Sequence, residues 1–111
     1  VLCCGGRNFN DYAFVSRHLD ALRAQSGDFA VVHGGAKGAD SLCGLWAEAK
    51  GLPNIVMRAN WNFYDNGAGP IRNQWMLDFC EPNYVVAFPG GSGTQNMITK
   101  SKLKGLTVWE L

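Results

Sequence analysis

The sequence repeats one succession three times: a short apolar run, a glycine group, and a stretch whose apolar residues have helical spacing. This succession is typical of βα units, in which parallel strands alternate with helices. Ten of the fourteen glycines fall into four groups, at Gly5-Gly6, Gly34-Gly35-Gly38, Gly67-Gly69 and Gly90-Gly91-Gly93. Three groups directly follow an apolar run, so we interpret the glycines as the ends of strands rather than as a sign of flexibility.

The pattern predicts five strands and four helices. Strands are expected at 1–4, 30–33, 54–59, 84–88 and 107–109. Helices are expected at 11–25, at 39–50, from Pro70 to the residue before Glu81, and around Met97 and Ile98 up to Lys104. Their predicted buried faces are Tyr12, Val15, Leu19 and Leu22; Leu42, Leu45, Trp46 and Ala49; and Ile71, Trp75 and Phe79.

Five strands alternating with four helices indicate an α/β fold, a Rossmann-like doubly wound parallel sheet with helices on both faces. The expected strand order is 3-2-1-4-5, and the 111 residues are expected to form one domain, 1–111. In such sheets ligands bind beyond the carboxyl ends of the strands, where the order reverses. That point lies between the first and fourth strands here. The first expected strand begins at Val1 itself, as in a chain whose start has been trimmed.

Composition narrows the function classes. A chain with 47% hydrophobic and 17% charged residues can fold, and its net charge of +1 provides no polybasic surface, so nucleic-acid binding is not expected. No apolar run approaches the ~20 residues of a membrane helix. The cysteines Cys3, Cys4, Cys43 and Cys80 form no CxxC pair, which favours free buried thiols and a reducing cytoplasm. Neither a metal site nor a resident cofactor is expected.

The glycine loop at 89–94 is the first candidate anion site. Its glycines let backbone N–H groups approach a phosphate or carboxylate, and the dipole of the following helix adds partial positive charge. Ser92 and Thr94 add hydroxyl donors. The loop lacks the GK[ST] of a Walker A motif and the GxGxxG of a dinucleotide fold.

Five further polar residues belong to the other glycine groups. Lys37 could contact a phosphate, Asp40 lies at a helix start, and His33 ends a strand, where it is either a structural hydrogen-bonder or a ligand group. Arg7 is costly to bury without an anionic partner. Arg72 lies in the first turn of its expected helix, where the dipole disfavours a cation, so a role in ligand binding is expected.

Taken together, these segments resemble the YspA/YpsA-like branch of the SLOG superfamily, which includes the Smf/DprA proteins and the LOG phosphoribohydrolases. The resemblance implies a Rossmann-like fold whose glycine loops hold a nucleotide or a nucleotide-derived ligand of the ADP-ribose type. The implied ligand residues are Gly5, Gly6, Arg7, His33, Gly34, Gly35, Lys37, Asp40, Arg72, Asn73, Pro89, Gly90, Gly91, Ser92, Gly93 and Thr94. Trp61, Phe63 and Tyr64 are candidates for stacking on the base.

The enzymatic activity of the LOG proteins carries over to this sequence less directly than their fold does. LOG enzymes cleave the N-glycosidic bond of nucleoside monophosphates with the signature Pro-Gly-Gly-x-Gly-Thr-x-x-Glu, whose glutamate position is Met97 here. A thioether cannot replace a carboxylate beside an oxocarbenium-like transition state. A hydrolase would have to combine Arg72 with Asp40 or Asp65.

The expected function is therefore that of a sensor or binding module. A LOG-like hydrolase is the alternative, and DprA-like binding of single-stranded DNA, suggested by Gly-Pro-x-Arg-Asn, is a further one. Related domains often form homo-oligomers, which stays possible here, while Trp46 and Trp109 are expected in the core rather than at an interface.

Overall fold

A computed structural model describes residues 1–59 and 67–111. In chain order the elements are β1 (Leu2–Cys4), α1 (Tyr12–Ser26), β2 (Val31–His33), α2 (Ala39–Ala49), β3 (Asn54–Val56), α4 (Ala68–Phe79), β4 (Tyr84–Ala87), α5 (Ser92–Leu103) and β5 (Thr107–Glu110). Two boundaries differ from expectation by more than one residue. Strand β3 ends three residues early, and helix α4 begins two residues before Pro70, so Arg72 is its fifth residue rather than part of its first turn.

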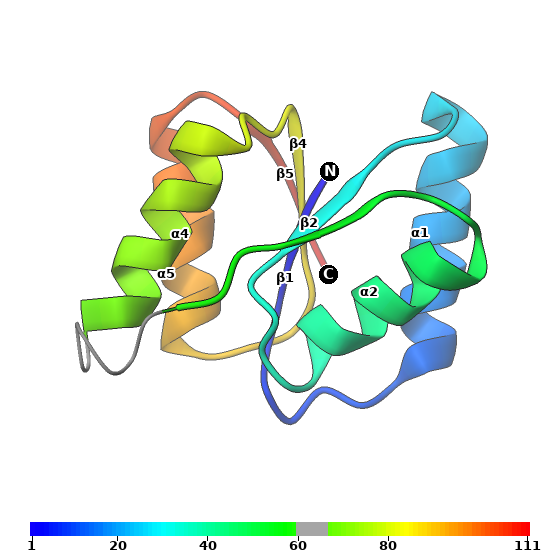
Figure 1. Cartoon of the computed structure of the whole chain (residues 1–111), viewed down its shortest axis with the longest axis horizontal. Helices are drawn as coiled ribbons and strands as arrows, with labels where there is room; N and C mark the ends of the chain where they lie inside the picture. Colours follow the sequence, from blue (N-terminus) through cyan, green and yellow to red (C-terminus); the bar gives the residue numbers. More distant parts are fainter. Residues whose placement is uncertain (60–66) are drawn as a thin grey trace.

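The five strands form one parallel sheet in the order β3-β2-β1-β4-β5, as predicted. Leu2 of β1 pairs with Val32 of β2 on one side and with Val85 of β4 on the other. Helices α1 and α2 cover one face of the sheet, and α4 and α5 cover the other (Figure 1). The order reverses at β1 and β4, which places the predicted switch point at the carboxyl ends of these two central strands.

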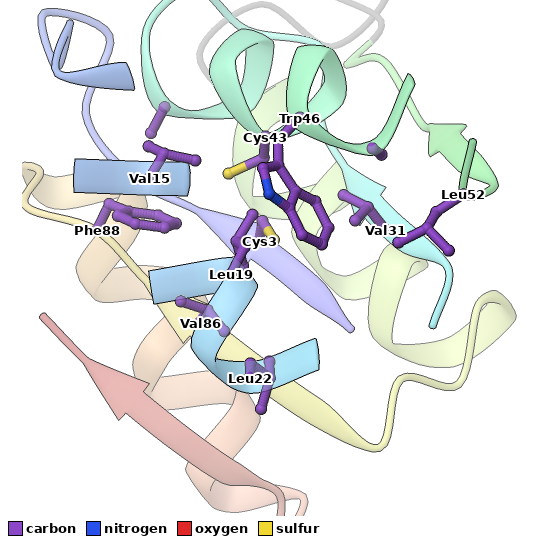
Figure 2. Close-up of a cluster of buried hydrophobic side chains, with 12 residues drawn as sticks. Cys3, Val15, Leu19, Leu22, Val31, Cys43, Trp46, Leu52, Val86 and Phe88 are labelled. Atoms are coloured by element: carbon purple, nitrogen blue, oxygen red, sulfur yellow. The ribbon is translucent and has the colours of Figure 1, made fainter. Parts of the chain in front are cut away.

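Alternating strand residues feed two separate cores. Cys3 joins the core under α1 and α2, whereas Leu2 and Cys4 join the core under α4 and α5, so the two neighbouring cysteines point to opposite faces as predicted. Figure 2 shows Trp46 of α2 packed over this first core, beside Cys3 and Val31. Trp46 is fully buried, and its indole N–H donates to Asp20 at 2.9 Å.

The helix faces were predicted only in part. Val15, Leu19 and Leu22 of α1 are buried as expected. Tyr12, Leu45, Ala49 and Phe79, however, were assigned to buried faces and are exposed, Leu45 by 55% and Phe79 by 73%.

Helix α2 turns its smallest side chains toward the sheet. Gly44 faces His33 and Asn54 so closely that an added Cβ would lie 2.8 Å from His33 Nε2. Cys43 and Ala47 are fully buried beside it, with Trp46. This close approach rotates Leu45 outward, because a helix buries only one stripe of its surface.

The helix ends follow local chemistry. Asp11 caps α1 by accepting a hydrogen bond from the backbone N–H of Phe14 at 3.0 Å, and Gly27, at φ +82°, ends the helix. None of the helices in the described residues has the length and hydropathy needed to cross a membrane. All four cysteines are free, and Cys80 is only half-buried.

Candidate functional site

A cavity of about 640 Å³ lies at the carboxyl ends of β1 and β4. Three helices begin at its wall: α2 contributes Asp40, α4 contributes Gly69, Pro70, Arg72 and Asn73 near its start, and α5 contributes Ser92 to Thr94. Each helix N-terminus carries partial positive charge and N–H groups without intrahelical partners. Three helix N-termini therefore converge on one cavity.

The loop before α5 is held against the loop after β1. The backbone N–H of Gly6 donates to the carbonyl of Pro89 at 2.9 Å, and a Cβ on Gly90 would lie 2.6 Å from Gly6 N. Gly91 and Gly93, in contrast, face open space, with nothing within 4 Å of an added Cβ. Helix α5 has neither a side-chain cap nor an acidic residue in its first turn, so in residues 1–59 and 67–111 neither kind of group neutralises its N-terminus.

Asp40 braces the loop between β2 and α2. Its Oδ2 accepts hydrogen bonds from the backbone N–H groups of Gly34 at 3.1 Å and Ala36 at 3.2 Å. Burial raises the pKa of Asp40, although the two backbone hydrogen bonds and the charges of His33 and Arg72 act in the opposite direction. The carboxylate therefore holds the loop conformation while facing the cavity.

Arg72 ties α4 to that same loop. Its Nη1 donates to the carbonyl of Gly34 at 2.8 Å, and its Nε donates to Asn73 Oδ1 at 3.0 Å. Asn73 in turn donates to the carbonyl of Gly93 at 3.3 Å and to Asn96 Oδ1 at 3.0 Å. A chain of hydrogen bonds thus runs from the β2 loop through α4 to the N-terminus of α5.

Two arginines approach the cavity together. Burial lowers the pKa of Arg72, Asp40 opposes this shift, and the charge of Arg7 adds to it, so the two guanidinium groups are close enough to repel each other. Both side chains line the cavity. An anion between them would relieve this repulsion.

A second cavity, of about 340 Å³, adjoins the first. The two share Arg7, Ala36 and Arg72 as lining residues. The second cavity adds Gly34, Gly35, Lys37, Arg58 and Ala59. Arg58 was not expected in the site, because it follows a strand with no motif around it.

His33 lines neither cavity. Its Nδ1 accepts a hydrogen bond from the backbone N–H of Gly35 at 3.0 Å, and its buried Nε2 lies under Gly44 beside Asn54. Burial lowers the pKa of His33, which keeps the ring neutral. This geometry agrees with the interpretation of His33 as a structural hydrogen-bonder rather than as a ligand group.

Comparison with known proteins gives the same family as the motifs. A sequence model of the YspA, cpYpsA-related SLOG family matches residues 1–64, more than half of the chain. The chain belongs to this family. The Gene 61 protein of Mycobacterium phage D29 is 32% identical to it over 120 residues, covering 97% of this chain and 92% of the phage protein. No solved structure gives a significant match.

Within this SLOG site, the position of the LOG glutamate is buried. Met97 is 0% exposed, packs in the core under α4 and α5, and lines neither cavity. The residue before it, Asn96, lines the first cavity. Asn96 was not among the expected ligand residues, although its polar side chain next to the glycine loop was an available signal.

The floor of the first cavity was also missed. Cys3, Cys4 and Met76 line it beneath the glycine loops. Burial raises the pKa of Cys4 far above its ordinary value, so this thiol stays protonated and is a poor nucleophile. In residues 1–59 and 67–111 no cluster of histidine, cysteine, aspartate and glutamate could hold a metal ion.

The candidate base-stacking residues Trp61, Phe63 and Tyr64, together with Asp65, lie outside the described residues. The remaining expected ligand residues converge. Gly5, Gly6, Arg7, Asp40, Arg72, Asn73, Gly91, Ser92, Gly93 and Thr94 line the first cavity, and Gly34, Gly35 and Lys37 line the second. Pro89 and Gly90 line neither cavity and instead hold the β4 loop against Gly6.

Proposed function

We propose that this SLOG domain binds a nucleotide or a nucleotide-derived ligand of the ADP-ribose type. The observation that carries the proposal is the convergence of three helix N-termini and two arginines on one cavity. A phosphate would sit at the start of α5, where Ser92 to Thr94 offer backbone N–H groups, with Arg7 and Arg72 on its other sides.

The electrostatics of the helix N-termini favour the binding of an anion. Helices α4 and α5 have no acidic residue in their first turns and no side-chain caps. Natural helices usually neutralise these orphan N–H groups with a capping side chain. A ligand phosphate would supply that missing partner.

The carboxylate inventory favours binding over hydrolysis. Asp40 is the one acidic residue among the described residues that line the first cavity, and its Oδ2 is already occupied by two backbone N–H groups. Met97 lies in the core. Cleavage of an N-glycosidic bond needs a carboxylate free to face the sugar, so a sensor or binding role fits these residues better.

A thermal-shift screen tests the proposal, with AMP, GMP, ADP and ADP-ribose as probes and chromatography of each mixture for free base. The informative variant is Gly91→Asp. Gly91 is the N-cap of α5 with open space around it, so the new carboxylate can cap the helix while occupying the phosphate position.

We expect nucleotide-induced stabilisation of the wild-type protein, loss of that stabilisation in Gly91→Asp, and retention of it in the control Ala21→Asp, which adds the same charge on the exposed side of α1. Equal stabilisation of both variants would refute the phosphate position. Steady release of free base would instead establish the hydrolase alternative.

A further inference from the structure

We propose that the second cavity is a second anion subsite, which makes the preferred ligand a nucleotide with at least two phosphoryl groups rather than a monophosphate. This inference rests on the proposed function. It concerns Arg58, which no motif assigns, together with Lys37 and the Gly34-Gly35 peptide.

The second cavity is strongly cationic. Its lining includes Arg7, Lys37, Arg58 and Arg72, and none of the described residues that line it is acidic. The whole chain carries a net charge of only +1, so four cationic side chains around about 340 Å³ are a local concentration rather than a general property of the surface. Like charges held together cost free energy unless an anion lies among them.

Two of these cations are held in place by neighbouring carbonyls. Arg72 Nη1 donates to the carbonyl of Gly34 at 2.8 Å, and Arg58 Nη1 donates to the carbonyl of Gly35 at 2.9 Å. These two bonds position both guanidinium groups along one short stretch of backbone. Each bond uses one of the five N–H groups that a guanidinium carries, so donors remain for a ligand.

The glycines make room for this arrangement. A Cβ on Gly35 would lie 2.8 Å from Arg58 Nη1 and 3.0 Å from its Cζ, and a Cβ on Gly34 would lie 2.5 Å from Arg72 Cζ. Gly35 also has φ +73°, a conformation that residues with side chains rarely adopt. The loop is thus shaped so that two arginine heads can rest directly on it.

The two cavities adjoin each other. Arg7, Ala36 and Arg72 belong to both linings, so the Arg72 guanidinium stands between the start of α5 and the Arg58 side. One phosphate at α5 would contact Arg72 from the first cavity. A second phosphoryl group on the same ligand would extend past Arg72 to Arg58 and Lys37.

Isothermal titration calorimetry with AMP against ADP, and GMP against GDP, tests this subsite. The variants are Arg58→Gln, Lys37→Gln and the double variant. The matched control is Arg23→Gln, which removes an arginine of α1 that is paired with Asp28. Charge-assisted hydrogen bonds are strong enough for a preference of about tenfold for the diphosphate over the monophosphate. We expect the double variant to reduce this preference below about twofold by weakening diphosphate binding, and Arg23→Gln to leave both affinities at their wild-type values.

The failures are distinguishable. Equal affinity of the wild-type protein for mono- and diphosphates, or an unchanged preference in the double variant, would overturn the second subsite and leave the first intact. Absence of binding by all four nucleotides would overturn the proposed function and this inference with it.

Discussion

Replacing Gly34 by alanine should disable the ligand site without unfolding the protein. Gly34 does not have a left-handed φ, so its backbone can accept an alanine. The added methyl group would lie 2.5 Å from Arg72 Cζ and 3.1 Å from Arg72 Nε. The atoms that it meets belong to the end of a flexible side chain, so the guanidinium will move rather than the sheet.

The expected cost follows from what Arg72 loses. Its 2.8 Å hydrogen bond to the Gly34 carbonyl is charge-assisted, and such bonds contribute about 1.5–3 kcal/mol where water is excluded. Arg72 is only half-buried, so about 1–2 kcal/mol is expected here. In a domain of this size that corresponds to a fall in Tm of roughly 5–10 °C. Loss of the guanidinium from a phosphate should also weaken binding by about ten- to a hundredfold.

Thermal unfolding and calorimetric titration with the nucleotide selected by the screen measure both effects. The control is Gly67→Ala. Gly67 has an ordinary φ, and the atom nearest to an added Cβ there is Ile71 Cδ1 at 3.8 Å. A double-mutant cycle with Arg72→Ala isolates the mechanism, because Gly34→Ala should add nothing once Arg72 is gone. Wild-type affinity in Gly34→Ala, or full additivity with Arg72→Ala, would show that Arg72 does not hold the ligand.

Two further predictions concern burial. Burial raises the pKa of Asp40, so this group contributes its full stability below its unfolded pKa of about 3.9 and loses it as the pH rises through the higher folded pKa. The Tm of the wild-type protein relative to that of Asp40→Asn should therefore fall with rising pH. A rise in this difference would contradict the burial argument. Trp46→Ala should lower the free energy of unfolding by about 3–5 kcal/mol, whereas Leu45→Ala on the same helix should change it by less than about 0.5 kcal/mol, as denaturant titration of the two variants would show.

The strand order and the anion loops could be predicted because they depend on local signals. Continuous apolar runs such as 84–88 indicate buried parallel strands, and glycines after them indicate turns that leave the carboxyl edge open. Chain direction then brings Gly5-Gly6, the loop after β2 and the loop at 89–94 to one edge. No knowledge of side-chain packing was needed for that step.

Two of the failures share one cause, which is that close approach between elements is invisible in periodicity. Leu45 has the spacing of a buried stripe, but Gly44 lets α2 approach the sheet with Cys43 and Ala47 facing inward. Arg58 likewise joins the site only because Gly35 leaves room for its head group. These are tertiary contacts, and a single sequence records only the glycines that permit them.

The loops of the site are tied to one another by hydrogen bonds within the protein. Gly6 accepts a hydrogen bond from the backbone N–H of Ala39 at 3.1 Å and donates one to Pro89, which joins the starts of α2 and α5. Asn73 links α4 to the carbonyl of Gly93 at 3.3 Å. Because folding has already ordered these groups, a phosphate would meet hydrogen-bond donors that need little rearrangement. The entropy cost of ordering the loops on binding would therefore be small. A substitution that breaks one of the hydrogen bonds between the loops should for the same reason alter affinity at the other loops. This is why Gly34, whose carbonyl accepts from Arg72 and which is far from α5 in sequence, is the position where the site is best tested.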